Sequence, residues 1–87
     1  PDFSKNVIMS NKNNNIALCV ESSLQQYFAD LDGETPCGVY DMVLHQVEEP
    51  LLRCVMQACE NNQTRAAQML GLNRNTLRKK LTQYNLL

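Results

Sequence analysis

Two adjacent alanines followed by a nearby glycine constrain the fold of this chain more than any other feature of its sequence. Ala66 and Ala67 have side chains small enough for a second helix to cross closely, and Gly71 permits the sharp turn that such a crossing needs. Leu72 follows the turn and is placed to fill the space beneath it. The pattern predicts a helix-turn-helix; a solvated helical hairpin is the alternative.

An asparagine precedes each of the two short helices that this pattern predicts. Asn62 stands before the segment 63–70, and Asn73 stands before the segment 74–83. Asparagine is a preferred N-cap because its side-chain oxygen accepts a hydrogen bond from a backbone N–H that has no partner within the helix. We therefore expect one helix over 63–70 and a second over 74–83.

The second of these helices has two chemically different faces. Leu77, Leu81 and Tyr84 are spaced by four and three residues, so they share one face and are expected to pack inward. The polar side chains on the opposite face and its flanks are those of Asn75, Thr76, Arg78, Lys79 and Thr82. A recognition helix needs this division, because one face anchors it while the other enters the major groove of DNA.

The charged residues are divided unevenly along the chain. Residues 61–87 contain five basic residues and no acidic one, whereas residues 16–60 contain eight acidic residues and one basic residue. A basic end on an acidic body directs one surface toward a polyanion. Chance clustering on a solvated helix is the alternative. We expect double-stranded DNA as the partner of the basic segment.

The expected contacts with DNA fall into two groups. Arg74, at the start of the second helix, is the candidate for a bidentate contact with guanine, and Asn73 beside it is the second candidate for a base edge. The side chains expected to contact phosphate are those of Asn62, Thr64, Arg65, Thr76, Arg78, Lys79 and Lys80.

Residues 16–60 repeat apolar side chains at helical spacing and predict two longer helices. The first runs from Ile16 to Leu31 and stops at Gly33, which suits the left-handed conformation beyond a helix end. The second covers 39–59 and keeps its apolar face in phase across Pro50, so we expect one kinked helix. The apolar faces consist of Val20, Leu24, Tyr27, Phe28 and Leu31 in the first helix, and of Tyr40, Val43, Leu44, Val47, Leu51, Val55, Met56 and Cys59 in the second.

These two helices carry more apolar surface than the small unit over 61–87 could cover. A chain this short usually buries such surface against a second copy of itself. We therefore expect an all-α fold with four helices per subunit, in which residues 16–60 form the core of a homodimer. Full burial within a monomer is the alternative. Residues 1–15 are Asn-rich and show no helical period, so we expect a mobile arm or a loose β-hairpin there, with disorder as the alternative.

The remaining features exclude several other classes of protein. The four cysteines match no zinc or disulfide spacing, so we expect buried or half-buried thiols that act as small hydrophobes, with no metal and no cofactor. The chain has one histidine and no set of residues typical of an active site, so we do not expect an enzyme, and we interpret Glu48 and Glu49 as a solvated face. We expect no membrane span and no export signal, and therefore a cytoplasmic location.

The motifs over residues 40–84 resemble the bacterial factor for inversion stimulation (Fis) family. The resemblance extends less tightly back to residue 16. The matching strings lie at residues 47–52 (VEEPLL), 62–67 (NQTRAA) and 73–81 (NRNTLRKKL), with further matches at residues 27–29 and 31–33. Some of these strings also resemble the DNA-binding domains of nitrogen-regulatory enhancer-binding activators, which keeps such a domain open as the alternative identity.

The resemblance implies an intertwined homodimer with a helix-turn-helix at each end. Its two recognition helices would sit closer than one DNA turn, so the duplex must bend, and much of the selectivity comes from the cost of that deformation. The family acts in the bacterial nucleoid, regulates transcription and assists site-specific recombination, which implies RNA polymerase or a DNA invertase as further partners. On this resemblance Asn73 and Arg74 take the base-contact role.

The sequence departs from the best-known members of the family at three places. Asn75 replaces a glycine beside the expected base contacts, and Thr82 and Gln83 replace basic residues. The arm over residues 1–15 matches poorly, which puts recombinase activation in doubt but not DNA binding. A helical dimerisation module that binds only protein is a third hypothesis, and the basic segment argues against it.

Overall fold

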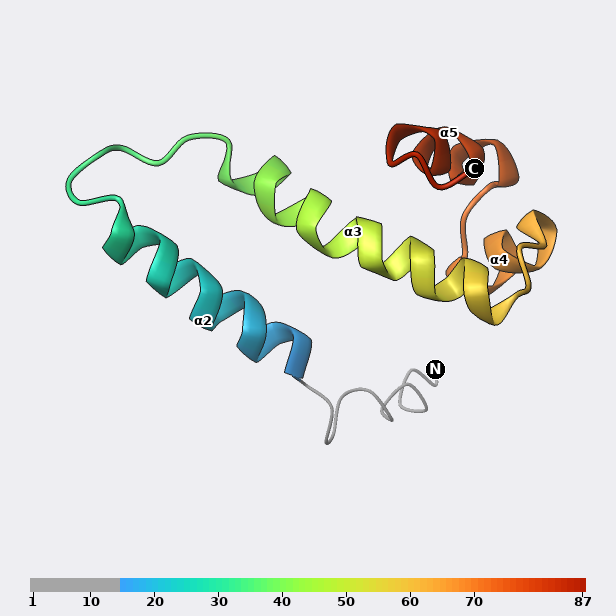
Figure 1. The fold of residues 1–87 in the computed structure, drawn as a ribbon, viewed down its shortest axis with the longest axis horizontal. Coiled ribbons are helices and arrows are strands. Elements are labelled where there is room, and N and C mark those ends of the chain that lie inside the picture. Colours follow the sequence, from blue (N-terminus) through green and yellow to red (C-terminus); the bar gives the residue numbers. More distant parts are fainter. Residues whose placement is uncertain (1–14) are drawn as a thin grey trace. The chain divides into compact units, whose positions relative to one another are not determined.

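The computed structural model describes residues 15–87, and all regular structure in this part of the chain is helical. No strand occurs between residues 15 and 87, so the predicted all-α class is confirmed there. Within the same range, no helix is both long and apolar enough to cross a membrane. The four helices in Figure 1 are α2 (Asn15–Asp30), α3 (Val39–Ala58), α4 (Gln63–Leu70) and α5 (Arg74–Gln83).

The described part of the chain divides into two compact units, with the boundary between Val39 and Tyr40. The second unit holds nearly all of α3 together with α4 and α5, whereas we expected a boundary near residue 60. The difference arises because the C-terminal half of α3 supplies part of the core on which α4 and α5 pack. The arm expected over residues 1–15 lies outside the described residues, apart from Asn15, which begins α2.

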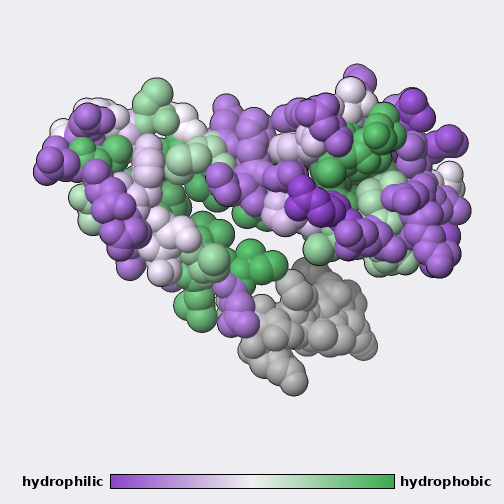
Figure 2. Space-filling view, in the orientation of Figure 1, coloured by the Kyte–Doolittle hydropathy of each residue, from purple (hydrophilic) through white to green (hydrophobic). Residues whose placement is uncertain are grey.

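Helix α2 ends in the left-handed turn that the sequence predicts. Gly33 has φ 91° and Asp32 has φ 53°, so the chain leaves the helix through two residues in this conformation. No side chain of α2 is buried within the chain, and Phe28 is 48% exposed although it lies on the predicted apolar face. Hydrophobic side chains are therefore visible on the surface of α2 in Figure 2.

Helix α3 is continuous through Pro50, which confirms the prediction of one helix and not two. Proline has no backbone N–H, so the bond to the carbonyl of Gln46 is missing at this point. Glu49 and Arg53 form an ion pair one helical turn apart, across the position of the proline. With 20 residues, the helix is about 30 Å long at 1.5 Å per residue.

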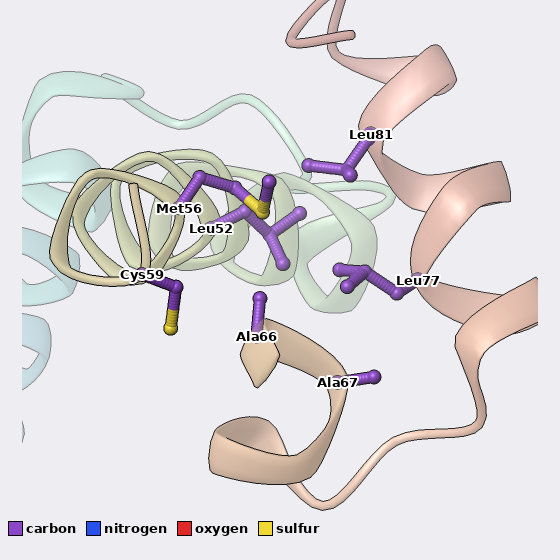
Figure 3. Close-up of a cluster of buried hydrophobic side chains, with 7 residues drawn as sticks. All are labelled: Leu52, Met56, Cys59, Ala66, Ala67, Leu77 and Leu81. Carbon is purple, nitrogen blue, oxygen red and sulfur yellow. The ribbon is translucent and has the colours of Figure 1, made fainter. Parts of the chain in front are cut away.

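One hydrophobic cluster joins α3, α4 and α5 (Figure 3). Leu52, Leu77 and Leu81 are almost completely buried and form its centre. The complete set of buried side chains is Leu52, Met56 and Cys59 from α3, Ala66 and Ala67 from α4, and Leu77 and Leu81 from α5. The helix-turn-helix therefore rests on α3 as its third helix.

The predicted apolar face of α3 missed one buried leucine, and the expectation about the cysteines is wrong for three of them. The predicted apolar face contained Leu51, but Leu51 is 45% exposed and Leu52 is the residue buried against α4 and α5. The two adjacent leucines point about 100° apart on the helix, so they serve different faces. Cys59 is buried as expected, whereas Cys19, Cys37 and Cys54 are exposed in the chain.

The turns between these helices are short and contain residues with positive φ. Gly71 has φ 75°, and the N–H of Leu72 then donates to the carbonyl of Ala67 at 2.9 Å. A Cβ on Gly71 would meet no atom within 4 Å, so the need for glycine comes from its φ and not from a lack of space. The turn before α4 places Glu60 and Asn61 in the same left-handed region.

The cluster predicts a large difference between two leucines of the same unit. Leu77→Ala should lower the free energy of unfolding by about 2–5 kcal/mol, because the truncation leaves a cavity at a position that is 0% exposed. Leu87→Ala, the matched control at 62% exposure, should change it by less than about 0.5 kcal/mol. Urea denaturation followed by circular dichroism measures both values. Equal losses would mean that α5 is not anchored through Leu77.

Candidate nucleic-acid interface

Both helices of the helix-turn-helix begin at the asparagines predicted to cap them. The side-chain oxygen of Asn62 accepts a hydrogen bond from the backbone N–H of Arg65 at 3.1 Å. The side-chain oxygen of Asn73 accepts from the backbone N–H of Asn75 at 2.7 Å. Because the oxygen of Asn73 is used by the cap, its amide NH₂ is the part of the side chain suited to donate to a base.

The two predicted faces of α5 are confirmed. Leu77 and Leu81 are fully buried and Tyr84 is half-buried, all toward the protein. Arg74 and Lys79 are exposed, as an approach to DNA requires. The other candidate residues with exposed side chains are Asn62, Thr64, Arg65, Asn73, Thr76 and Arg78.

Arg78 and Gln63 link the two helices on the solvent side. A guanidinium nitrogen of Arg78 lies 3.4 Å from the side-chain oxygen of Gln63, which is the first residue of α4. This contact holds the cation of Arg78 near the N-terminus of α4, where the backbone N–H groups also favour an anion.

Lys80 differs from the other candidate cations. Its ammonium nitrogen donates to one carboxylate oxygen of Glu48 at 2.6 Å, and the two side chains are 30% and 16% exposed. The expectation that Lys80 contacts phosphate stays a prediction, and the ion pair with Glu48 on α3 competes with such a contact. The cations of α4 and α5 that face solvent are Arg65, Arg74, Arg78 and Lys79.

The interpretation of Glu48 as part of a solvated face is wrong. The second carboxylate oxygen of Glu48 accepts a hydrogen bond from the hydroxyl of Tyr84 at 2.7 Å. Lys80 first, and then Tyr84, lower the pKa of Glu48 below its ordinary value of 4.5 because they donate to its ionised form, while partial burial acts in the opposite direction. Desolvation and the bond to Glu48 raise the pKa of Tyr84 to about 12.

The sign of the Glu48 shift fixes how this contact depends on pH. The pKa of Glu48 in the folded state lies below its ordinary value of 4.5, so the contact contributes its full stabilisation at pH values above 4.5. The contribution is lost as the pH falls through the lowered pKa. The contact is therefore fully formed at neutral pH.

Two further polar side chains complete the junction between α3 and α5. The rings of His45 and Tyr84 meet edge to face with centroids 5.7 Å apart, and the side-chain amide of Gln83 lies 3.2 Å from the Nε2 atom of His45. We call Glu48, Lys80, Tyr84, His45 and Gln83 the polar junction. One sequence feature could have indicated the polar junction. Glu48 stands four residues before Leu52, on the face of α3 that packs on α5.

The chain is similar to proteins of one family. Residues 43–84, which include all of α4 and α5, match the family model described as bacterial regulatory protein, Fis family. The chain is 67% identical over 72 residues to a Fis-like DNA-binding protein of Neisseria meningitidis serogroup A, an alignment that covers 83% of this chain and 91% of the relative.

Two other relatives show the same pattern. A Fis-like DNA-binding protein of Ralstonia nicotianae is 58% identical over 85% of this chain and 96% of its own length. The DNA-binding protein Fis of Proteus mirabilis is 54% identical over 77% of this chain and 68% of its own length. The similarity therefore includes both the helix-turn-helix and much of the region before it.

Substitutions at Asn73 should separate the capping role from contact with DNA. Asn73→Asp keeps an oxygen for the cap and adds a negative charge that the N-terminus of α5 favours, so the free energy of unfolding should not fall. DNA affinity should fall at least tenfold, because the amide donor is lost and the new charge faces phosphate. Asn73→Ala, as control, should lose about 1 kcal/mol of stability. Denaturation and gel-shift titrations test this, and wild-type affinity in Asn73→Asp would exclude a direct contact.

Proposed function

The chain belongs to the Fis family of bacterial regulatory proteins, and we propose that it is a dimeric protein of the bacterial nucleoid that binds and bends DNA and regulates transcription. The observation that carries the proposal is the division of α5 into two faces. Leu77 and Leu81 are fully buried, while Arg74 and Lys79 on the same helix are exposed. Such a helix can enter a major groove without losing its contacts to the protein.

The residues divide into base and phosphate contacts. Arg74 is placed to read guanine, because N-terminal residues of a recognition helix reach base edges and Arg pairs with guanine in two hydrogen bonds. Asn73 is the second base contact, through its amide NH₂. The phosphate contacts that we assign are Asn62, Thr64, Arg65, Thr76, Arg78 and Lys79, and we leave out Lys80 because Glu48 neutralises it.

Apolar side chains that the single chain leaves exposed support the homodimer. Ile16, Leu18 and Phe28 of α2 are each about half exposed or more, as is Tyr40 at 77% in α3. Exposed apolar surface of this kind marks an interface, and a second copy of the chain is the partner that closed symmetry favours. In this proposal residues 16–60 form the dimer and each subunit presents one helix-turn-helix.

The main alternative is the DNA-binding domain of an enhancer-binding activator. The aligned region makes up 91% of the Neisseria relative, which leaves no room in that protein for an ATPase domain. This favours a free-standing DNA-binding protein. We assign no residues to RNA polymerase or to a DNA invertase, the two further partners that the family resemblance implies.

Bending and dimer formation are tested together. In a circular-permutation gel assay, complexes with the binding site near the middle of the fragment should migrate more slowly than those with the site near an end. Analytical ultracentrifugation should give twice the chain mass in free solution and two chains per DNA site. Equal mobility for all fragments would exclude bending, and a monomer bound to one half-site would exclude the dimer.

Arg74 and Lys79 should respond differently to truncation, although both are exposed on α5. Arg74→Ala should cost about 1–3 kcal/mol of binding at the specific site and relax the preference at one base pair per half-site. Lys79→Ala, the matched control, should weaken binding to all sequences alike and lower the slope of log K against log [salt] by about 1 per subunit. Competition gel shifts over single-base variants measure both, and a base-specific effect of Lys79→Ala would reverse the two roles.

A further inference from the structure

We infer that Glu48 is a positioning residue for DNA binding, which fixes the C-terminal half of α5 on α3 and removes the charge of Lys80 from the DNA-facing set. The inference rests on the DNA binding proposed above. It assigns a function to a residue of α3 that lies outside the helix-turn-helix. It also predicts that two adjacent lysines, Lys79 and Lys80, contribute unequally to the attraction for DNA.

The geometry engages both oxygens of the Glu48 carboxylate with α5. One accepts from Lys80 at 2.6 Å and the other accepts from the Tyr84 hydroxyl at 2.7 Å. Lys80 and Tyr84 lie one helical turn apart on α5, so a single carboxylate spans that turn. Among residues 15–87, this is the ion pair that joins two helices, since the pair of Glu49 and Arg53 lies within α3.

The hydrophobic cluster and the bonds to Glu48 constrain the rotation of α5 together. Leu77 and Leu81 hold the helix against α3 and α4, but contacts between apolar groups have no preferred direction. Hydrogen bonds do have one, because donor and acceptor must align. The two bonds to Glu48 therefore add a directional constraint to the packing that turns Arg74 and Lys79 toward solvent.

The groups around the Glu48 carboxylate also favour its contact with α5. From α5, Lys80, Gln83 and Tyr84 face this region, and the ring of His45 on α3 packs on the edge of Tyr84. Glu49, the neighbouring acid, is paired with Arg53 on its own helix. Lys80 has a long flexible stem that could otherwise extend into solvent and reach a phosphate. Glu48 is the group that prevents it.

The consequence concerns the balance between specific and non-specific binding. Every phosphate that a cation neutralises strengthens binding to all sequences and steepens its dependence on salt. Because Glu48 neutralises Lys80, the protein keeps Lys80 as a structural contact without adding to non-specific attraction. The cations left to attract DNA are then the exposed ones of α4 and α5, namely Arg65, Arg74, Arg78 and Lys79.

The test is a double-mutant cycle read as a salt slope on a DNA fragment without a specific site. Glu48→Gln keeps an oxygen for Tyr84 but removes the charge that holds Lys80, so the slope of log K against log [salt] should steepen by about 0.9 per subunit. Lys80→Met in the wild-type background should leave the slope unchanged. The double variant should return to the wild-type value. Glu49→Gln is the matched control, because it removes the same charge from the neighbouring residue and should not change the slope.

The results separate a failure of this inference from a failure of the proposed DNA binding. The inference is overturned if Lys80→Met lowers the slope of log K against log [salt] as much as Lys79→Met does. It is also overturned if the wild type shows salt-dependent binding and Glu48→Gln leaves its slope unchanged. If the wild type shows no salt-dependent binding, the proposed function fails and this inference fails with it. Circular dichroism checks the fold of each variant, and if Glu48→Gln does not fold, the Lys80→Met arm alone gives the answer.

Discussion

The burial of Leu77 and Leu81 against Leu52 is the contact on which the rest of the structure depends. These three side chains are at most 1% exposed, and they bring the last helix onto α3 although neither α4 nor α5 has enough apolar surface to fold alone. Ala66 and Ala67 permit this contact because their small side chains let α4 lie within the same cluster. With one face of α5 packed on the protein, Arg74, Arg78 and Lys79 lie on the solvent side, while Lys80 pairs with Glu48 of α3.

Local features of the sequence were sufficient to predict the helix-turn-helix. The bounds of α4 and α5, the caps at Asn62 and Asn73 and the left-handed turn at Gly71 are all as predicted. Each of these depends on residues within a few positions of one another, so short-range hydrogen bonds and φ preferences determine them. The exposure of the candidate DNA contacts follows in turn from the 3.6-residue period.

Contacts between distant residues could not be predicted in the same way. Glu48 is 32 residues from Lys80 and 36 residues from Tyr84, and no local pattern states that α3 and α5 meet at that point. The burial of Leu52 was missed for the same reason, because α3 is apolar on two faces and the sequence does not say which one meets α5. Cys19, Cys37 and Cys54 show that apolar composition does not by itself predict burial within a single chain.

The two apolar faces of α3 give this helix a mechanical role in the proposed dimer. Leu52 and Met56 anchor the helix-turn-helix, while Tyr40 and Leu51 lie on surface that the single chain leaves open. If that surface packs on a second copy, one helix connects the dimer interface to the recognition helix in each subunit. Because α3 continues through Pro50 without a loop, rigid structure and not a flexible linker would set the separation of the two recognition helices in the proposed dimer. In the proposed dimer, such a helix would resist adjusting to straight DNA whose grooves are spaced differently, which is the physical reason for the proposed bending.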